Sequence, residues 1–518
     1  MIKLGNQLCS MKNIITIFIT LFSFSAYSQN TPAYYFTDSL RIQKLKSTQQ
    51  IVDRIYKEYA REKNFPGFTY AVIADGKMLY SGNMGFTDIN KKLPVNNSSA
   101  FRIASMTKSF TTLAILKLRD EGKLRLDDPA FLYIPEMKNI KYLTNDAPAI
   151  TVRDLMTHSA GFPEDNPWGD RQLAVSNDKL IDVVKTVSFS NIPGISYEYS
   201  NLGFALLGYI INQVTGKPYD EYINENILNP LGMHNTYWEY KNVLPDKLAL
   251  GYRWINNQWK EVELLHHGAY GAMGGLITTI EDFSKYAALH LSAWPPSNEN
   301  ESTVLKKSSL REMHQPWRFN NMNLNFKYPN GRTCPLAIAY GYGLGWSKDC
   351  EGRVRVGHSG GLPGFGSYWA MLPEYGIAVV SFANVTYAPN TFINLKVLDS
   401  IITMSDLKPR RLAPSDILLK RKNELLALLP NWKNAKESGI FAVNFFDDYI
   451  MDSLIKESEI LYKKAGKILR VGEIKPENQL RGSFVLEGEI TDLEIYFTLS
   501  PEYPPLLQEY SIREKKKK

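Results

Sequence analysis

The order of the strand-like segments constrains the fold of this chain most strongly. Residues 66–85 hold two such segments joined at Asp75-Gly76, a dipeptide that favours the tight turn of a β-hairpin. Segments typical of helices and loops follow. Three further strand-like segments come only after them, at residues 338–346, 354–358 and 367–384. Strand-like segments before and after the helical region predict an α+β fold. In it, the N-terminal and C-terminal strands form one antiparallel sheet, which is flanked by helices and carries a helical insert.

A change of composition predicts a second domain. Residues 407–414 (LKPRRLAP) read as a basic linker that contains proline. Beyond it come helix-like segments and then short strand-like ones, at residues 417–429 and 445–464 and around Phe484, Ile495 and Leu506. We therefore expect a main domain over residues 29–405 and a small C-terminal α+β domain over residues 414–518.

The N-terminus is typical of an export signal. From Met11, a lysine precedes an apolar run, and the small-x-small sequence AYS at residues 26–28 ends it. The run is shorter than the roughly 20 residues that a membrane span needs. We expect a signal peptide over residues 1–28, cleavage after Ser28, an exported protein in the periplasm or the medium, and no stable membrane span after cleavage.

Charge and cysteine content bound the partners and the redox chemistry. The 518 residues carry a net charge of +7, and their dense basic run is the KKKK of the C-terminus, so we expect no nucleic-acid partner. Cys334 and Cys350 flank a segment that reads as one long strand. Because such a strand would hold the two residues far apart, we expect free thiols.

Ser105 and Lys108 form the first pair with catalytic potential. They lie one helical turn apart, so their side chains share a face of the helix. The Ser-x-x-Lys pattern is common, and it recurs at Ser176/Lys179, Ser405/Lys408 and Ser453/Lys456. Ser105 differs because it opens a periodic apolar helix that runs to about Leu118 and closes at Gly122. A lysine at the positive end of a helix dipole is electrostatically unfavourable, which indicates that Lys108 has a functional role there.

Other kinds of site are excluded by their missing patterns. The sequence has no HExxH, no cysteine pair at zinc spacing, no phosphate-binding loop and no dinucleotide fingerprint, and His266-His267 are adjacent and diverge, so we expect no metal and no cofactor. Residues 357–361 (GHSGG) fit the G-x-S-x-G elbow of α/β-hydrolases. That elbow needs a helix after Ser359 and a later histidine, but a loop and strand follow and His358 is the last histidine. We reject it.

A Ser/Lys pair needs a further proton carrier and an oxyanion hole. Tyr199-Ser200-Asn201 is a candidate, because Tyr199 lies on a turn directly before an apolar helix, unlike the other Tyr-x-Asn copies at Tyr222, Tyr240 and Tyr328. Asn201 or Ser200 can equally serve as the N-cap of that helix. Glycines in residues 358–361 would let the backbone approach a substrate closely.

These elements, in this order, resemble the serine β-lactamase and penicillin-binding-protein superfamily, in the branch of class C β-lactamases, DD-peptidases, D-aminopeptidases and esterases. The resemblance covers about residues 66–384. The matching segments are FRIASMTKSFTTLAILKLRDEGKLRLDDP, ITVRDLMTHSAGFP, YSNLGFALLG, LNPLGMHNT, AMGGLITTIEDFSKY and GYGLGW…VGHSGGLPGF.

The resemblance implies roles for single residues. The serine of S-x-x-K, here Ser105, is the acylated nucleophile, and Lys108 and the Y-x-N tyrosine, Tyr199, assist it. Either can be the base, Lys108 if burial lowers its pKa and Tyr199 if cations stabilise its phenolate, so we assign them jointly. The third motif, K-T-G in β-lactamases, falls on His358 and the two residues after it. Substrate binding and the oxyanion hole fall to Gly361, Asn201 and His358, with the Ser105 and Gly361 amides as donors.

The histidine in the third motif bears on the substrate. A lysine there holds the β-lactam carboxylate, whereas His358 is mostly neutral at pH 7. We therefore expect an exported serine hydrolase that forms an acyl-enzyme at Ser105 and acts on small amide, peptide or ester substrates, including those with D-amino acids. A β-lactamase and a penicillin-binding sensor without turnover are the alternatives. The sequence predicts neither the oligomeric state nor the role of the C-terminal domain.

Overall fold

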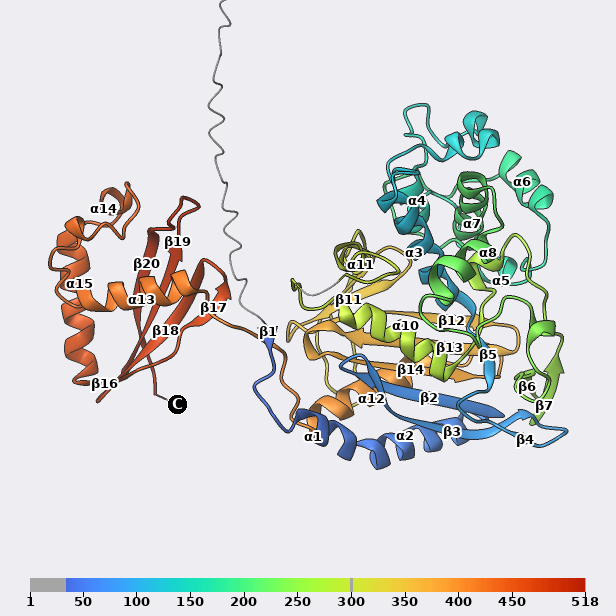
Figure 1. Ribbon diagram of the computed structural model, residues 1–518, viewed down its shortest axis with the longest axis horizontal. Helices are drawn as coiled ribbons and strands as arrows, with labels where there is room; N and C mark the ends of the chain where they lie inside the picture. Colours follow the sequence, from blue (N-terminus) through green and yellow to red (C-terminus); the bar gives the residue numbers. More distant parts are fainter. Residues whose placement is uncertain (1–33, 299–300, 518) are drawn as a thin grey trace, which may run out of the picture. The chain divides into compact units, whose positions relative to one another are not determined.

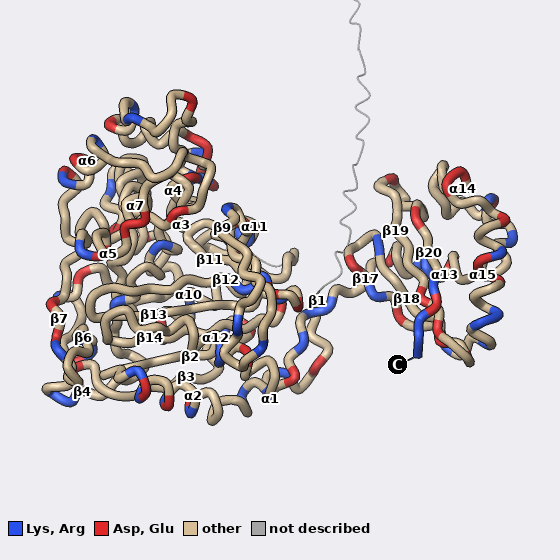
Figure 2. The backbone as a smooth tube through the Cα atoms, turned by 180° about the vertical axis from the view of Figure 1, so that it is seen from behind, with Lys and Arg blue, Asp and Glu red and all other residues tan. Residues whose placement is uncertain are grey.

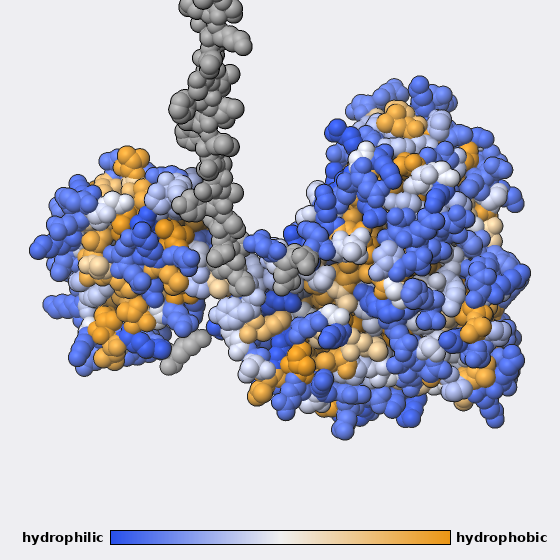
Figure 3. Space-filling model, in the orientation of Figure 1, coloured by the Kyte–Doolittle hydropathy of each residue, from blue (hydrophilic) through white to orange (hydrophobic). Residues whose placement is uncertain are grey.

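The computed structural model describes residues 34–298 and 301–517 (Figure 1). The expected signal peptide, residues 1–28, and its cleavage site lie outside these residues. The described chain divides into two compact units, with the boundary between Ala413 and Pro414. None of the helices described is long and apolar enough to cross a membrane. Figure 3 shows a largely hydrophilic face on both units, and Figure 2 shows basic and acidic residues interspersed along each of them.

A nine-stranded sheet forms the centre of the first unit, in the order β4-β3-β2-β14-β13-β12-β11-β10-β9. Its strands are β2 (Gly67–Ala74), β3 (Lys77–Asp88), β4 (Leu93–Pro94), β9 (Arg318–Asn323), β10 (Leu336–Tyr340), β11 (Gly345–Asp349), β12 (Val354–Leu362), β13 (Phe365–Leu372) and β14 (Ile377–Ala383). All neighbours in it pair antiparallel. The N-terminal hairpin turns at Asp75 and Gly76, which both have positive φ, and joins the C-terminal strands where β2 pairs with β14. The predicted sheet closed by both ends is confirmed.

Helices bury both faces of this sheet. Alternate residues of β14 point to opposite sides: Val380 belongs to the core beneath the helical insert, and Val379 to the core beneath the terminal helices. A strand covered on both faces therefore reads as a continuous apolar run. The terminal helices are α1 (Arg41–Ser47), α2 (Gln49–Glu62) and α12 (Asn390–Met404). Figure 1 shows them on one side and the insert on the other.

The helical insert lies between β3 and β9, as predicted. Its elements are β5 (Ala100–Arg102), α3 (Thr107–Asp120), α4 (Val152–Met156), α5 (Asn166–Gly169), α6 (Asn177–Lys185), α7 (Asn201–Thr215), α8 (Tyr219–Ile223), β6 (Gly251–Ile255), β7 (Gln258–Val262), α9 (Gly271–Gly274), β8 (Ile277–Thr279), α10 (Ile280–Ser292) and α11 (Lys307–Met313). Helix α3 is buried on almost every side, and Phe110 on it stacks on Tyr286 with 3.8 Å between ring centroids. This packing fixes the position of the α3 N-terminus.

The predicted free thiols are wrong. The segment between the cysteines is a hairpin rather than one strand, because Gly343 adopts a positive φ and the chain turns back between β10 and β11. Leu336 therefore pairs with Asp349, and Cys334 and Cys350 come within 5.8 Å (Cα–Cα) in a disulfide.

One further detail differs from the expectations. The segment 367–384 is two strands, β13 and β14, because a turn at Gly376 with positive φ separates them. This difference does not move the core. Helix α10 is capped by Thr279, whose side chain accepts the hydrogen bond from the Asp282 amide.

The second unit has its own core. Its elements are α13 (Asp416–Leu428), α14 (Phe445–Asp448), α15 (Met451–Ala465), β16 (Ile468–Val471), β17 (Lys475–Asn478), β18 (Arg481–Gly488), β19 (Asp492–Leu499) and β20 (Leu507–Lys515). The strands make one antiparallel sheet whose buried residues alternate along β18 and β19. The apolar cluster of this unit is built from its own residues, with Trp432, Phe445 and Phe497 among them. Whether it folds alone stays a prediction.

Candidate active site

Ser105 and Lys108 are brought together at the start of α3. Ser105 lies in a 3-10 turn over residues 104–106 that leads into the helix, and the residue before it, Ala104, has φ +50°. A non-glycine residue in this region stores backbone strain, which is frequent at functional sites. Ser105 is 7% exposed and Lys108 fully buried, and Lys108 Nζ lies 3.0 Å from Ser105 Oγ.

Lys108 Nζ has two further partners. It donates to Asn201 Oδ1 at 2.7 Å and to the Met273 carbonyl at 2.9 Å. Burial lowers the pKa of Lys108 to about 7, although the charges of Asp170 and Asp165 raise it. A substantial fraction of the amine is therefore neutral at neutral pH and able to accept a proton.

Tyr199 lies beside this pair, just before α7. Its ring centroid is 4.9 Å from Lys108 Nζ. Burial raises the pKa of the Tyr199 phenol well above its ordinary value, and the nearby Ser105 hydroxyl only partly opposes this. Tyr199 is therefore a neutral phenol that can donate a proton.

The Asn201 side chain does not cap α7 and is therefore free to hydrogen-bond to Lys108. Ser200 is the N-cap, and its Oγ accepts from the Gly203 amide at 3.2 Å. Asp165 caps the same turn, since its carboxylate accepts from the Asn201 amide at 2.6 Å. Asn201 itself is fully buried and lies behind the cavity, with Nδ2 donating to Asn166 Oδ1 at 3.2 Å.

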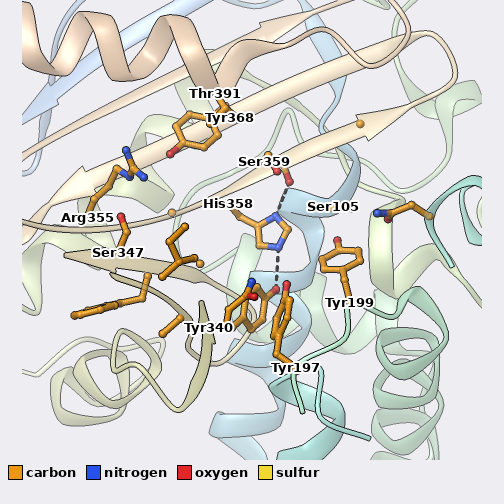
Figure 4. Close-up of a pocket in the computed structure, with 18 of the residues that line it drawn as sticks. Ser105, Tyr197, Tyr199, Tyr340, Ser347, Arg355, His358, Ser359, Tyr368 and Thr391 are labelled. Atoms are coloured by element: carbon orange, nitrogen blue, oxygen red, sulfur yellow. Dashed lines mark hydrogen bonds between the residues drawn. The ribbon is translucent and has the colours of Figure 1, made fainter. Parts of the chain in front are cut away.

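His358 is held in one neutral form on β12. Its Nδ1 hydrogen-bonds to the Ser359 carbonyl, which can only accept, so Nδ1 carries the proton. Nε2 then accepts from the Tyr340 hydroxyl at 2.8 Å (Figure 4). Burial lowers the pKa of His358 to about 3, and the Lys108 charge acts in the same direction. The imidazole thus carries no positive charge at neutral pH.

Two glycines of β12 shape the contact between this strand and the nucleophile. A Cβ on Gly360 would lie 2.2 Å from the Ile103 carbonyl oxygen, so only glycine lets the strand pack against the segment before Ser105. A Cβ on Gly361 would lie 2.9 Å from the Tyr387 ring. Strand β11 pairs with β12 only as far as Gly357, so its ladder leaves this part of β12 uncovered.

One cavity of about 710 Å³ joins these elements. Ser105, Tyr199, His358 and Gly361 all line it, and Figure 4 shows Ser105, Tyr199 and His358 gathered around it. Four of the predicted site residues therefore share one wall, while Lys108 and Asn201 lie behind Ser105. Ser359 also lines the cavity, but β12 continues as a strand to Leu362, so no helix follows it and the hydrolase elbow is absent.

The sequence reasoning missed Asp170 in the cavity wall. Its Oδ2 accepts from the Tyr387 hydroxyl at 2.9 Å, while Oδ1 is buried without a partner among the described residues. Burial raises the pKa of Asp170 to about 6, although the Tyr387 bond and the Lys108 charge lower it. No pattern in the loop (DNPWGD) marks this residue, because Tyr387 is distant in the sequence.

His158 was missed as well. It lies in the segment THSAGF, accepts from the Ser200 amide at 3.0 Å through Nδ1, and packs its ring 4.2 Å from the Tyr199 ring. A histidine next to Ser and Gly in a loop gives no sign of such a contact. The adjacent His266 and His267, in contrast, pair with Glu239 and Asp220 respectively.

Known proteins match most of the first unit. Residues 52–399 match the family model described as Beta-lactamase. Protein flp of Staphylococcus aureus (strain MW2) is 29% identical over 348 residues, which are 66% of this chain and 64% of that protein, so the match spans less than two thirds of the relative. Beta-lactamase-like protein 2 of Dictyostelium discoideum is 26% identical over 527 aligned residues, 94% of this chain and 90% of that protein.

Solved structures share the fold. The octameric penicillin-binding protein homologue from Pyrococcus abyssi gives a TM-score of 0.55 at 25% identity, covering 91% of this chain and 96% of that one. The penicillin binding protein from Bacillus halodurans gives 0.53 at 24% identity, over 67% and 98% of the respective chains. The latter likeness concerns the fold alone.

Proposed function

Because this chain belongs to the β-lactamase family and has the serine hydrolase-type fold of that superfamily, we propose that it forms an acyl-enzyme at Ser105 and hydrolyses small amide, peptide or ester substrates. The observation that carries the proposal is the buried contact of Lys108 Nζ with Ser105 Oγ, at 3.0 Å, together with a Lys108 pKa of about 7. A serine hydroxyl becomes an effective nucleophile only when a base takes its proton.

Lys108 supplies that base in the acylation step. Neutral Lys108 takes the hydroxyl proton as Ser105 Oγ bonds to the carbonyl carbon of the substrate. The carbonyl oxygen becomes negative, and the amides of Ser105 and Gly361 donate to it. Each such donor is worth about 3 kcal/mol in comparable sites. The charges of Asp170 and Asp165 stabilise the Lys108 ammonium that forms.

Tyr199 completes the proton transfer. When the bond to the leaving group breaks, the Tyr199 phenol protonates that group and regains its proton from the Lys108 ammonium. Water then attacks the acyl carbon, gives its proton to neutral Lys108, and Ser105 Oγ leaves with that proton. A phenol whose pKa is raised by burial suits the role of proton donor better than that of resting base, so we assign the base to Lys108.

The neutral His358 bears on the choice of substrate. Its position matches the lysine that holds the carboxylate of a β-lactam, but a pKa of about 3 leaves it uncharged. We therefore propose that uncharged esters and amides are better substrates than anionic β-lactams. Acylation without turnover is the second candidate, because the relative from Pyrococcus abyssi, at 25% identity, is named as a penicillin-binding protein homologue.

Export is part of the proposal. The disulfide between Cys334 and Cys350 supports it, because disulfides persist in oxidising compartments such as the periplasm and the extracellular medium.

Covalent labelling tests the proposal. The intact protein is treated with a fluorophosphonate and, separately, with 4-nitrophenyl acetate, and mass and nitrophenol release are followed. We expect one adduct and repeated turnover for the wild type, neither for Ser105→Ala, and both for Ser359→Ala. An adduct that survives in Ser105→Ala would overturn the proposal, and an ester adduct that is never released would favour the sensor.

A further inference from the structure

The cavity continues beyond the catalytic residues, past the end of the β11–β12 ladder. Residues of β12 alternate between the two faces of the sheet: His358 pairs with Trp369, in the core under the helical insert, and Ser359 pairs with Tyr368, in the core under α12. Arg355 follows the phase of Ser359 and pairs with Ser347 of β11. The far arm of the cavity, lined by Arg355, Ser347 and Tyr368, thus lies on the α12 face.

The polar groups of this far arm make no hydrogen bonds to the described residues. Among the residues that the structure describes, none hydrogen-bonds to the Arg355 guanidinium or to the hydroxyls of Ser347 and Tyr368, although Ser347 is 5% and Tyr368 6% exposed. Figure 4 shows the Arg355 and Tyr368 heads pointing toward one another, with Ser347 beside Arg355. At the catalytic end of the cavity, by contrast, Lys108 and His358 are hydrogen-bonded to neighbouring side chains.

The carboxylates near Arg355 face other arginines. Asp349 pairs with Arg332 at 3.2 Å, and Asp399 faces Arg353 at 3.7 Å. Glu351 is bound by Arg332 as well, at 2.6 Å. The Arg355 charge lowers the pKa of the Asp399 carboxyl against the effect of burial, but the Arg355 guanidinium makes no hydrogen bond or ion pair with the described residues. It lines the cavity beside the hydroxyls of Ser347 and Tyr368.

We propose that this far arm binds a carboxylate of the substrate. A guanidinium presents a planar fork of donors that matches the two oxygens of a carboxylate, and the hydroxyls of Ser347 and Tyr368 add donors in the same arm. The inference rests on the proposed function and narrows its substrate class. The cation that binds the carboxylate is Arg355 rather than a residue at position 358. The two positions lie about 10 Å apart along the strand, at 3.3 Å per residue. Substrates thus carry their carboxylate about 10 Å along the strand from the place of a β-lactam carboxylate at position 358.

Matched esters test this distance. The probes are the mono-4-nitrophenyl esters of succinic and suberic acid, each compared with its methyl-capped diester, in which the carboxylate is uncharged. We expect kcat/KM for the suberate ester to exceed that for its capped form by about tenfold, as for a charge-assisted hydrogen bond. The short succinate ester should show no such preference.

Variants locate the effect. Arg355→Gln should reduce the preference for the suberate carboxylate to about one, and Arg355→Lys should keep part of it. Lys348→Gln is the control, because it removes a positive charge from the opposite face of the neighbouring strand and should keep the full preference. An equal preference in wild type and Arg355→Gln, or a loss in Lys348→Gln, would overturn the proposal.

Binding without chemistry separates this inference from the proposed function. Calorimetry with the full-length Ser105→Ala protein should show that monomethyl suberate binds more tightly than dimethyl suberate, and that Arg355→Gln in the same background removes the difference. If no nitrophenyl ester is cleaved through Ser105, the proposed function fails, and the calorimetry still decides on Arg355. Equal binding of the two suberates would contradict the carboxylate site and would leave the proposed function unaffected.

Discussion

The same short pattern, Ser-x-x-Lys, occurs in two regions of the first unit with opposite surroundings. At the start of α3, Ser105 and Lys108 are buried and their side chains are in contact at 3.0 Å. At the start of α6, Ser176 and Lys179 are exposed, and the serine hydroxyl accepts from the backbone amide of the lysine as an N-cap. The pattern places both pairs on one face of a helix, but only burial turns that into a contact.

The difference comes from groups distant in the sequence. Lys108 is enclosed by Asn201 and Met273, and its amine loses the water that would stabilise its charge. Lys179 has no such cover. A buried lysine beside a serine can act as a base, whereas an exposed one mainly interacts with water. We therefore expect the same substitutions to lower activity in the first region and to leave it unchanged in the second.

The nucleophile should show the largest contrast. We expect Ser105→Ala to lower ester turnover by at least about 10⁴-fold, because Ser105 is the proposed site of the acyl-enzyme, and Ser176→Ala to leave it unchanged. Initial rates with 4-nitrophenyl acetate measure both. Comparable rates for the two variants would remove the distinction between the regions.

The lysines should show the next contrast. Lys108→Met keeps much of the side-chain volume and removes the base, so we expect turnover to fall by about 10²- to 10⁴-fold, the usual range for general-base catalysis. Lys179→Met should have the wild-type rate. Thermal unfolding of both proteins checks that the loss is chemical, and a fully active Lys108→Met would show that Tyr199 is the base.

A second cation beside the buried Ser105/Lys108 pair should change the substrate preference. His358→Lys adds a positive charge that repels the Lys108 ammonium and lies where the carboxylate of a β-lactam would sit. We expect the rate of nitrocefin hydrolysis to rise by about tenfold relative to that of nitrophenyl acetate, which is about 1.4 kcal/mol. If wild-type protein already cleaves nitrocefin at about 10 per second or more, a typical enzyme rate, the argument from charge fails.

Removal of the second unit should have the smallest effect. The β1–β15 pair (Tyr34–Tyr35 with Arg411–Leu412) and the Arg410 hydrogen bond to the Pro373 carbonyl both lie before Ala413. A chain that ends at Ala413 keeps them, so we expect soluble protein with esterase activity within about twofold of the full chain. Insoluble or inactive protein would show that the second unit contributes to the core or the site.

Local patterns were sufficient to predict the sheet, the helical insert and the α3 helix. The Asp75-Gly76 turn and the apolar run after Ser105 act over a few residues, and the structure has both. The turn at Gly343 was missed because an apolar segment rich in glycine reads equally well as a strand or as a hairpin. The disulfide depends on that turn, so it was missed with it.

The site was predictable where the superfamily resemblance supplied it and not beyond. Asp170 and Tyr387 are hydrogen-bonded although they lie 217 residues apart in the sequence. Arg355 is a candidate binding residue only because its guanidinium makes no hydrogen bond to the described residues. Such pairings follow from how strands and loops pack in three dimensions, and no spacing in the sequence encodes them. The neutral state of His358 likewise depends on burial and on the Lys108 charge, and its Nε2 is bonded by Tyr340 from another strand.

The central claim is that Lys108 is neutral near pH 7 and takes the Ser105 proton. Its most direct test is the rate of Ser105 acylation by an uncharged ester, followed by rapid quenching and intact-mass measurement from pH 5 to pH 10. Neutral amine is the active form, so the rate should rise with pH, with a midpoint near the Lys108 pKa of about 7. Asp170→Asn removes a charge that raises this pKa, so its midpoint should move to lower pH. A midpoint near 10, or one that Asp170→Asn leaves in place, would contradict the account.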